Sequence, residues 1–402
     1  MPVTPQDIET AHAAIQHHVL HTPTVPAPRL SEPLQARLWL KLENLQYTGS
    51  FKDRGSCYKL MALAAEPSPP AGVVAASAGN HAQGVAYHAG RLGIPATIVM
   101  PLTTPFAKVE RTEGHGATVV LHGESVAECT VHAKELAERD GLAFVHPYDD
   151  ERIVAGQGTV AREMLADAPQ LDTLVVPIGG GGLCAGMAMW AKHVKPDIRV
   201  LGVQIEGCPS MHAALRGEPM PEPNTHTLAD GIAVKTPGAI PLAILREHLD
   251  EVLLVGERDV ENAVQMLAAQ QKVVAEGAGA AGIAAMLRHP QHFRGRDVGV
   301  VICGGNIDRR LLSTVLLRGL QRDGKIAKLV IAIHDVPRVL ARVTQLIGAL
   351  GADVVDVEHQ RLFNDVAPRE AELHVVMETR GAAHVERILA ELREAGFAAK
   401  AV

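Results

Sequence analysis

Apolar and polar positions follow two alternating periods along most of this chain. Short runs rich in valine and other apolar residues occupy 72–77, 96–101, 117–123, 143–148, 173–178, 199–206, 251–256 and 297–305. Segments with helical spacing of apolar residues lie between these runs. Short buried strands separated by amphipathic helices are typical of βαβ units. The pattern therefore predicts a two-lobed α/β unit built on parallel sheets.

Both ends of the chain depart from this alternation. Residues 1–20 have helical spacing, with Thr4 as the expected cap and Pro5 in the first turn, and a short strand is expected at 37–43. After 323 the order becomes strand 328–335, helix 337–352, strand 353–363, strand 370–379, helix 381–397 and a last strand at 397–402. This order predicts a ferredoxin-like module.

The predicted domain boundaries follow from these patterns. We expect a first domain at 1–322, with its smaller lobe at about 48–150, and a C-terminal α+β domain at 323–402. The change of pattern falls at Asp323–Lys325.

Composition excludes several classes of protein. The chain has 402 residues, a formal net charge of −7 and only 3% aromatic residues, which argues against nucleic-acid binding. Neither a signal peptide nor an apolar run of about 18 residues is found, so we expect a cytoplasmic protein without a membrane partner. Five scattered cysteines without CxxC spacing argue against a disulfide framework and a zinc site.

The stretch from Asn44 to Leu60 carries the first candidate for chemistry. Lys52 follows a small polar turn and Phe51, and a helix is expected to start near Asp53. Burial of a lysine at such a junction favours the neutral amine, which Schiff-base chemistry with an aldehyde requires. The alternative is an ordinary solvated lysine.

Three glycine-rich turns follow predicted strands. Ser77 to Gly84 opens a helix, so its N–H groups could hold a carboxylate, with Asn80 as a further donor. Gly179 to Leu183 opens another helix, and its four glycines favour a phosphate site over a simple turn. Cys303 to Asn306 forms the third turn.

One segment also fits a different class of enzyme. Gly180, Gly182 and Ala185 match the dinucleotide fingerprint G-x-G-x-x-A, and Glu206 ends the following strand. A nicotinamide-dependent oxidoreductase is therefore an alternative, although it leaves the lysine turn unexplained.

Five motifs together give a specific resemblance. In chain order they are SFKDRG, SAGNHAQG, GGGGL, EGAGA and CGGNID. The chain resembles the fold type II (tryptophan-synthase-β-like) pyridoxal-phosphate enzymes, and within them most closely the threonine dehydratase (threonine ammonia-lyase) family. The resemblance covers residues from about 5 to 320, and the last 75 or so residues resemble an ACT domain.

The resemblance implies a role for each motif. Lys52, next to Phe51, would bind the cofactor aldehyde covalently and act as the general base at the substrate α-carbon. Asn80 would contact the cofactor's ring oxygen. The remaining candidates are the substrate-carboxylate turn of Ser77, Ala78, Gly79, Asn80 and His81, and the phosphate cradle of Gly179, Gly180, Gly181, Gly182 and Leu183.

Four further residues have roles that the resemblance suggests. Cys303 would face the pyridine nitrogen, and because a thiol is a weak donor the ring would stay neutral, which favours β-elimination. Glu276 is either a polar neighbour of the ring or a helix cap. Glu206 is a candidate cation ligand. Tyr148 either borders the substrate pocket or packs under the lobe.

The C-terminal module is expected to be regulatory or to join subunits. ACT domains commonly bind an amino-acid effector at the turn after the first strand, where they have a glycine. This chain has Arg338 at that place, which would block or alter an allosteric site. Exposed sheet edges also favour a homo-oligomer, a dimer or a tetramer.

The resemblance thus implies a lyase that converts L-threonine, and L-serine as well, to 2-oxo acids and ammonia, in isoleucine synthesis or in threonine breakdown. The alternatives within the fold are a serine or hydroxyaspartate dehydratase and a serine racemase. A non-catalytic amino-acid sensor is the alternative outside it.

Overall fold

The computed structural model describes residues 3–361 and 370–402. The chain divides into two compact units, Met1–Ile307 (unit 1) and Asp308–Val402 (unit 2). The boundary expected at Asp323 lies at the end of helix α13, Arg309–Arg322, which falls within unit 2. The assignment of α13 to the first domain stays a prediction.

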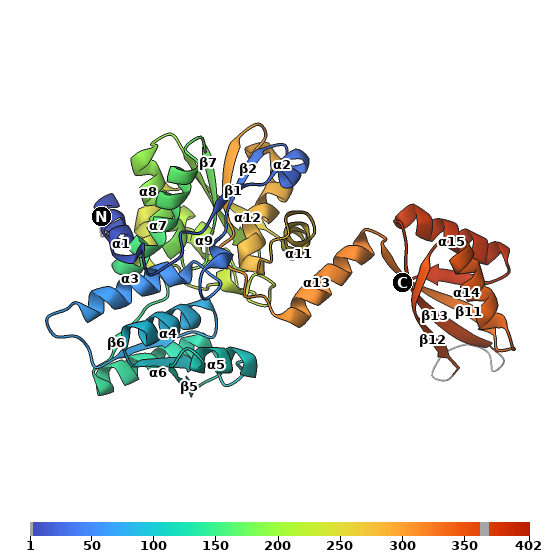
Figure 1. Cartoon of the computed structure of the whole chain (residues 1–402), viewed down its shortest axis with the longest axis horizontal. Coiled ribbons are helices and arrows are strands. Elements are labelled where there is room, and N and C mark those ends of the chain that lie inside the picture. The colour runs from blue at the N-terminus through green and yellow to red at the C-terminus, as the bar shows by residue number, and fades with distance from the viewer. Residues whose placement is uncertain (1–2, 362–369) are drawn as a thin grey trace. The chain divides into compact units, whose positions relative to one another are not determined.

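Unit 1 contains a large and a small sheet, as the alternating pattern predicts (Figure 1). The large sheet has the order β1 (Thr24–Pro26), β2 (Arg37–Lys41), β10 (Asp297–Val301), β7 (Thr173–Pro177), β8 (Arg199–Ile205) and β9 (Glu251–Val255). All its pairs are parallel except β1 with β2. The small sheet is entirely parallel, with the order β5 (Thr118–Leu121), β4 (Ala96–Met100), β3 (Val73–Ala76) and β6 (Ala143–Phe144).

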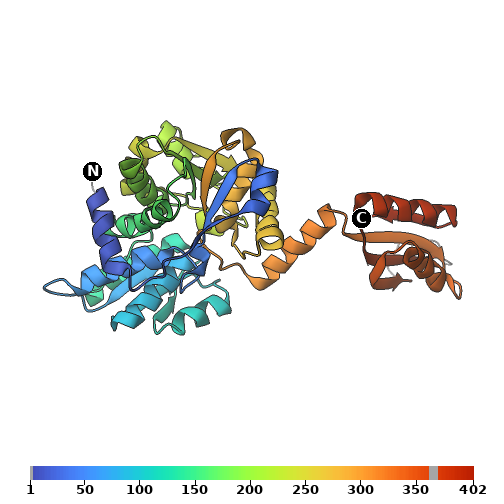
Figure 2. The same cartoon turned by 45° about the horizontal axis from the view of Figure 1, so that its top comes forward.

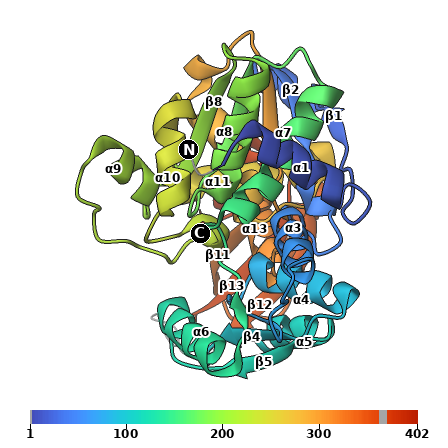
Figure 3. The ribbon, with the colours of Figure 1, turned by 90° about the vertical axis from the view of Figure 1, so that its left-hand side faces the viewer.

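Helices cover both sheets. Those of unit 1 are α1 (Pro5–Ile15), α2 (Pro28–Leu34), α3 (Lys52–Ala64), α4 (Asn80–Leu92), α5 (Phe106–Glu113), α6 (Val126–Asp140), α7 (Glu151–Asp167), α8 (Gly182–Val194), α9 (Ser210–Arg216), α10 (Ala239–His248), α11 (Glu257–Met266) and α12 (Gly277–Arg288). Helices α7, α8 and α10 lie on one side of the large sheet, and α3 runs between the two sheets (Figures 2 and 3). No helix among the described residues has both the length and the apolar character of a membrane span.

The first helix is shorter than the sequence suggests. Thr4 caps α1 and Pro5 begins it, as expected, but the helix ends at Ile15 instead of continuing to residue 20. The side-chain amide of Gln46 makes two hydrogen bonds to the backbone of Leu20. Its oxygen accepts from the Leu20 N–H at 3.0 Å, and its nitrogen donates to the Leu20 carbonyl at 2.8 Å. These two bonds hold the chain in a path that a continued helix could not follow.

The strand expected at 143–148 is also shorter. It ends at Phe144, and Pro147 has no N–H group for a sheet partner. The ring nitrogen Nδ1 of His146 accepts from the N–H groups of Tyr148 and Asp149 at 3.3 and 2.8 Å. The chain therefore leaves the edge of the small sheet at this turn.

A buried cluster of charges anchors α3. Arg54 is fully buried and makes paired hydrogen bonds to Glu43 on one side (2.8 and 2.8 Å) and to Glu163 of α7 on the other (2.7 and 2.6 Å). Lys41, at the end of β2, donates to Glu163 at 2.7 Å and to the carbonyl of Thr22 at 2.6 Å. Although burial opposes it, Arg54 and Lys41 lower the pKa of Glu163 to about 2. Two positive and two negative charges thus balance inside the core.

Unit 2 has the ferredoxin-like topology that its pattern predicts. Its antiparallel sheet has the order β12 (Asp353–Gln360), β13 (Glu370–Glu378), β11 (Ile326–His334) and β14 (Ala398–Ala401). Residues 362–363 of the predicted strand 353–363 lie outside the described residues. Helices α14 (Val339–Ala349) and α15 (Ala382–Glu394) pack on the alternate apolar side chains of the strands, including Leu329, Ile331 and Leu373.

Candidate active site

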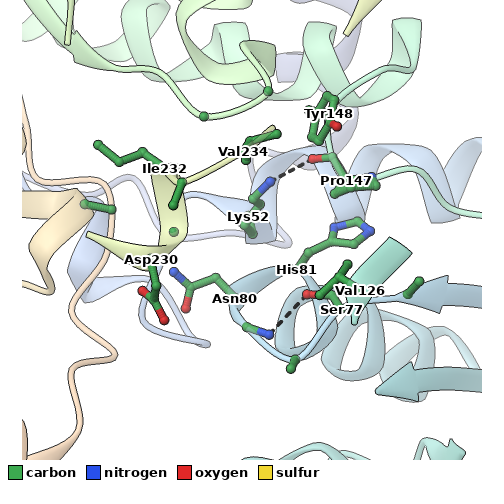
Figure 4. Close-up of a pocket in the computed structure, with 18 of the residues that line it drawn as sticks. Lys52, Ser77, Asn80, His81, Val126, Pro147, Tyr148, Asp230, Ile232 and Val234 are labelled. Carbon is green, nitrogen blue, oxygen red and sulfur yellow. Dashed lines mark hydrogen bonds between the residues drawn. The ribbon is translucent and has the colours of Figure 1, made fainter. Parts of the chain in front are cut away.

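A cavity of about 760 Å³ lies in unit 1, lined by residues of both the large-sheet and the small-sheet side (Figure 4). Its walls include the N-terminal ends of three helices, α3, α4 and α8, together with the turns after β6 and β10 and the segment 230–236. Helix N-termini carry unpaired N–H groups and a partial positive charge, so this cavity suits a ligand with several anionic groups.

Lys52 begins α3 and points into the cavity (Figure 4). Its ammonium donates to the carbonyl of Pro147 at 2.7 Å and lies 5.1 Å from the centre of the Phe51 ring. Burial lowers the pKa of Lys52 to about 8 from its ordinary 10.5, although Cys303 and Glu276 oppose the shift. Lys52 is therefore not a solvated surface lysine, and a substantial fraction of it is neutral near pH 8.

The turn before Lys52 is held against the loop after β10. The N–H of Phe51 donates to the carbonyl of Cys303 at 3.0 Å, and Ser50 pairs with Gly304 as an isolated bridge. Cys303 is buried, and this burial, together with Glu276, raises the pKa of its thiol well above the ordinary value. Cys303 thus remains a protonated thiol at the wall of the cavity.

The turn Ser77–His81 forms the N-terminal end of α4. Ser77, Ala78, Gly79, Asn80 and His81 all line the cavity, and the hydroxyl of Ser77 accepts from the N–H of Gly79 at 3.1 Å. His81 is buried and donates from Nε2 to the carbonyl of Val145 at 3.0 Å. Burial, aided by the charge of Lys52, lowers the pKa of His81 to about 3. This imidazole is neutral at neutral pH and offers no charge to a substrate.

Glu276 occupies the N-cap position of α12 without a capping hydrogen bond from its side chain, and it lines the cavity beside Asn80. The amide nitrogen Nδ2 of Asn80 donates to its Oε1 at 2.7 Å. Burial, with a contribution from Asp230, raises the pKa of Glu276 to about 7. Glu276 is therefore a buried neighbour of the candidate residues and not a simple exposed helix cap.

The glycine loop Gly179–Leu183 lies at the N-terminal end of α8, and at Gly180 and Gly181 it has no room for a side chain. A Cβ on Gly180 would overlap the ring of Tyr148, and Gly181 has φ +103°, where an added Cβ would lie 2.6 Å from Met211. Tyr148 lines the cavity, rests on this loop and donates its hydroxyl to the carbonyl of Thr236 at 3.0 Å. Both suggestions for Tyr148, pocket wall and packing residue, thus describe its position.

Glu206 lies apart from these residues. It is exposed and pairs with Arg288 at 2.5 Å. Within residues 3–361 and 370–402, no three His, Cys, Asp or Glu side chains are grouped as metal ligands. Cation binding by Glu206 stays a prediction, and no set of ligands surrounds this residue among the described residues.

Part of the cavity wall comes from residues outside the sequence motifs. The segment Asp230–Thr236 lines the cavity, as do Lys108 and Arg111 of α5. The ammonium nitrogen of Lys108 lies 3.9 Å from a carboxylate oxygen of Asp230, so this ion pair links α5 to the segment Asp230–Thr236. The sequence signal was the irregular, glycine-containing stretch DGIAVKTPG between two regular elements.

Comparisons with known proteins agree with this geometry. Residues 15–304 match the family model described as "Pyridoxal-phosphate dependent enzyme". The chain is 40% identical to an L-threonine ammonia-lyase of Thermotoga maritima over 401 residues, which cover all of both chains. Among solved structures it resembles the processed form of threonine deaminase isoform 2 from Solanum lycopersicum (33% identity, TM-score 0.73, 78% of this chain and 88% of that one). It also resembles a maize serine racemase (32% identity, TM-score 0.74, 80% and 99%).

Proposed function

Because this chain belongs to the family of pyridoxal-phosphate-dependent enzymes, we propose that it is an L-threonine ammonia-lyase. It converts L-threonine to 2-oxobutanoate and ammonia, and L-serine to pyruvate and ammonia. The observation that carries this function is the likeness to an L-threonine ammonia-lyase over the whole of both chains. Because the chain belongs to this family, Gly180, Gly182 and Ala185 are not interpreted as a nicotinamide-binding fingerprint.

The cavity residues fit pyridoxal phosphate. A Cβ on Gly180 or Gly181 would collide with Tyr148 or Met211, so bare backbone lies at the cavity wall here, beside the N–H groups at the start of α8. Gly179, Gly182 and Leu183 complete this phosphate site. The amine of Lys52 has the lowered pKa that capture of an aldehyde requires.

The same arrangement supports roles for the ring neighbours. Asn80 is the donor to the cofactor's ring oxygen, and Glu276 is its polar partner. The Cys303 thiol, with its raised pKa, is a weak donor to the pyridine nitrogen, so it leaves the ring unprotonated. When bound, pyridoxal phosphate draws electrons from the amino-acid α-carbon, which makes its proton acidic and lets the β-hydroxyl leave.

The chain's own residues then position the substrate and move the proton. The N–H groups at the start of α4, in the turn Ser77–His81, bind the substrate carboxylate. Lys52 accepts the α-carbon proton on Nζ, and the carbonyl of Pro147 stabilises the resulting ammonium. His81 stays neutral because of its low pKa, so it does not compete with Lys52 as a second base.

An assay of three products tests this function against the serine racemase alternative. The purified protein is incubated with pyridoxal phosphate and either L-threonine or L-serine, and 2-oxobutanoate, pyruvate and D-serine are quantified. We expect 2-oxobutanoate from L-threonine. A protein that binds the cofactor but releases D-serine faster than either 2-oxo acid would be a racemase instead.

The lowered pKa of Lys52 predicts a pH dependence of cofactor capture. Only the neutral amine attacks the aldehyde, so the capture rate of cofactor-stripped protein should rise about tenfold per pH unit below 8 and level off above it. The rate is followed as visible absorbance after mixing with pyridoxal phosphate. A rate that still rises up to pH 10 would show that Lys52 titrates as an ordinary exposed lysine.

For unit 2 we propose an ACT-like regulatory role, with an amino-acid effector as its candidate ligand and with homo-oligomer formation. Its ferredoxin-like sheet supports this role. Arg338, at the N-terminus of α14, has φ +76°, in the left-handed region that favours glycine.

We also propose a cytoplasmic location for this protein. All five cysteines are buried free thiols, which fits a reducing compartment.

Replacing Arg338 by glycine should therefore stabilise unit 2. The left-handed conformation costs a non-glycine residue about 1–2 kcal/mol, and the extra freedom of glycine in the unfolded chain returns about 0.5–1 kcal/mol of that. We expect a small net gain, measured as a higher calorimetric unfolding temperature of Arg338→Gly. A lower temperature would show that the arginine side chain makes contacts that outweigh its backbone strain.

A further inference from the structure

Asn306, in the turn after β10, links three parts of the active site. Its side-chain nitrogen donates to the carbonyl of Thr48 at 2.7 Å and to Oδ1 of Asn80 at 2.8 Å. Its oxygen lies 3.4 Å from a guanidinium nitrogen of Arg111 in α5. The turn before Lys52, the start of α4 and the loop after β10 therefore meet at one amide.

The carbonyl of Thr48 determines which way this amide points. A backbone carbonyl only accepts hydrogen bonds, so the atom of Asn306 that faces it must be the NH₂ group. The same nitrogen faces Asn80, so Asn80 must turn its oxygen toward Asn306. The nitrogen of Asn80 then faces Glu276, to which it donates at 2.7 Å.

Close packing holds these side chains against the backbone. A Cβ on Gly304 would overlap Glu276 and lie 3.1 Å from Nδ2 of Asn80. A Cβ on Gly49 would lie 2.8 Å from Oδ1 of Asn306. The two glycines thus allow the amides to lie directly against the backbone, and the carbonyl of Thr48 sets which amide atom faces which partner.

We propose that Asn306 is a positioning residue, which fixes the amide of Asn80 so that an N–H group, and not the oxygen, is presented to the cofactor. One hydrogen of Asn80 Nδ2 binds Glu276, and the other remains for a ligand in the cavity that Asn80 lines. A cofactor ring oxygen, which accepts hydrogen bonds, is recognised only in this orientation. This inference rests on the proposed function.

Two substitutions of similar size separate orientation from packing. Asn306→Asp keeps the shape but has no donor for Thr48 or Asn80, so it should turn the Asn80 oxygen toward the cavity. Asn306→Leu removes the donors without supplying a competing acceptor. The hydrogen bond that is lost joins Asn80 to the ionised ring oxygen of the cofactor, and a bond to a charged group contributes more than a neutral one. We therefore expect pyridoxal phosphate to bind about 10- to 100-fold more weakly to the Asp variant, with a smaller loss for the Leu variant.

The test measures cofactor dissociation constants by equilibrium dialysis and the absorption maximum of the bound cofactor, which reports on the ring oxygen. Both substitutions are also made in an Asn80→Ala background, where their effect should be much smaller, because only the hydrogen bond from Asn306 to Thr48 is then left to lose. Equal affinity and spectrum in wild type and Asn306→Asp would overturn the inference, as would an undiminished effect in the Asn80→Ala background. If the wild type itself fails to bind pyridoxal phosphate, the proposed function fails instead.

Discussion

Lys52→Ala should abolish the release of 2-oxo acid. The variant loses both the amine that captures the cofactor and the base that accepts the α-carbon proton at Nζ. A positioned general base alone contributes up to about 10⁴-fold, so we expect turnover to fall by at least that factor. Activity is measured as 2-oxobutanoate release from L-threonine, and cofactor attachment as visible absorbance of the dialysed protein.

Two further variants make this result specific. Lys52→Arg keeps a positive charge but supplies no neutral amine, and should be equally inactive. Lys134→Ala is the matched control, because Lys134 is an exposed lysine of α6 whose ammonium lies over the ring of Phe144. It should retain the wild-type rate. Sustained 2-oxo acid formation by Lys52→Ala would disprove the assignment of the base.

Arg54→Met should be the most destabilising of the substitutions considered. It removes one of two positive charges from the buried cluster and leaves Glu43 and Glu163 with only Lys41 as a counter-charge. Removing one partner of a buried ion pair costs about 3–5 kcal/mol. Both tryptophans, Trp39 and Trp190, lie in unit 1, so urea unfolding followed by tryptophan fluorescence reports on this unit.

A charge-balanced double variant tests the physical reason. Arg54→Met with Glu163→Gln leaves one positive and one negative charge, so its cost should be below the sum of the two single costs by about 1–3 kcal/mol. Arg37→Met is the matched control, since Arg37 makes an exposed pair with Asp297 and should cost less than about 1 kcal/mol. Equal losses for Arg54→Met and Arg37→Met would show that the buried cluster contributes no more than a surface pair.

Local sequence signals predicted most of the fold. Apolar runs and helical spacing located the strands of both sheets except β1, which lies in a proline-containing stretch, and helix α3 begins within one residue of its predicted start at Asp53. These signals succeed because backbone periodicity and glycine content depend on neighbouring residues. They fail where a distant side chain intervenes, as when Gln46 binds the backbone of Leu20 beyond the end of α1.

The same distinction between local signals and distant contacts holds for the candidate site. The sequence alone determined that Lys52 lies at the start of a helix, that Ser77–Gly84 and Gly179–Leu183 open helices, and that a ferredoxin-like module follows. Only the tertiary structure decided that Glu276, Asn80 and Asn306 form one hydrogen-bonded chain, and that Glu206 lies outside it with Arg288. The reason is that pKa and hydrogen-bond direction depend on burial and on partners far apart in the chain, which no local pattern records.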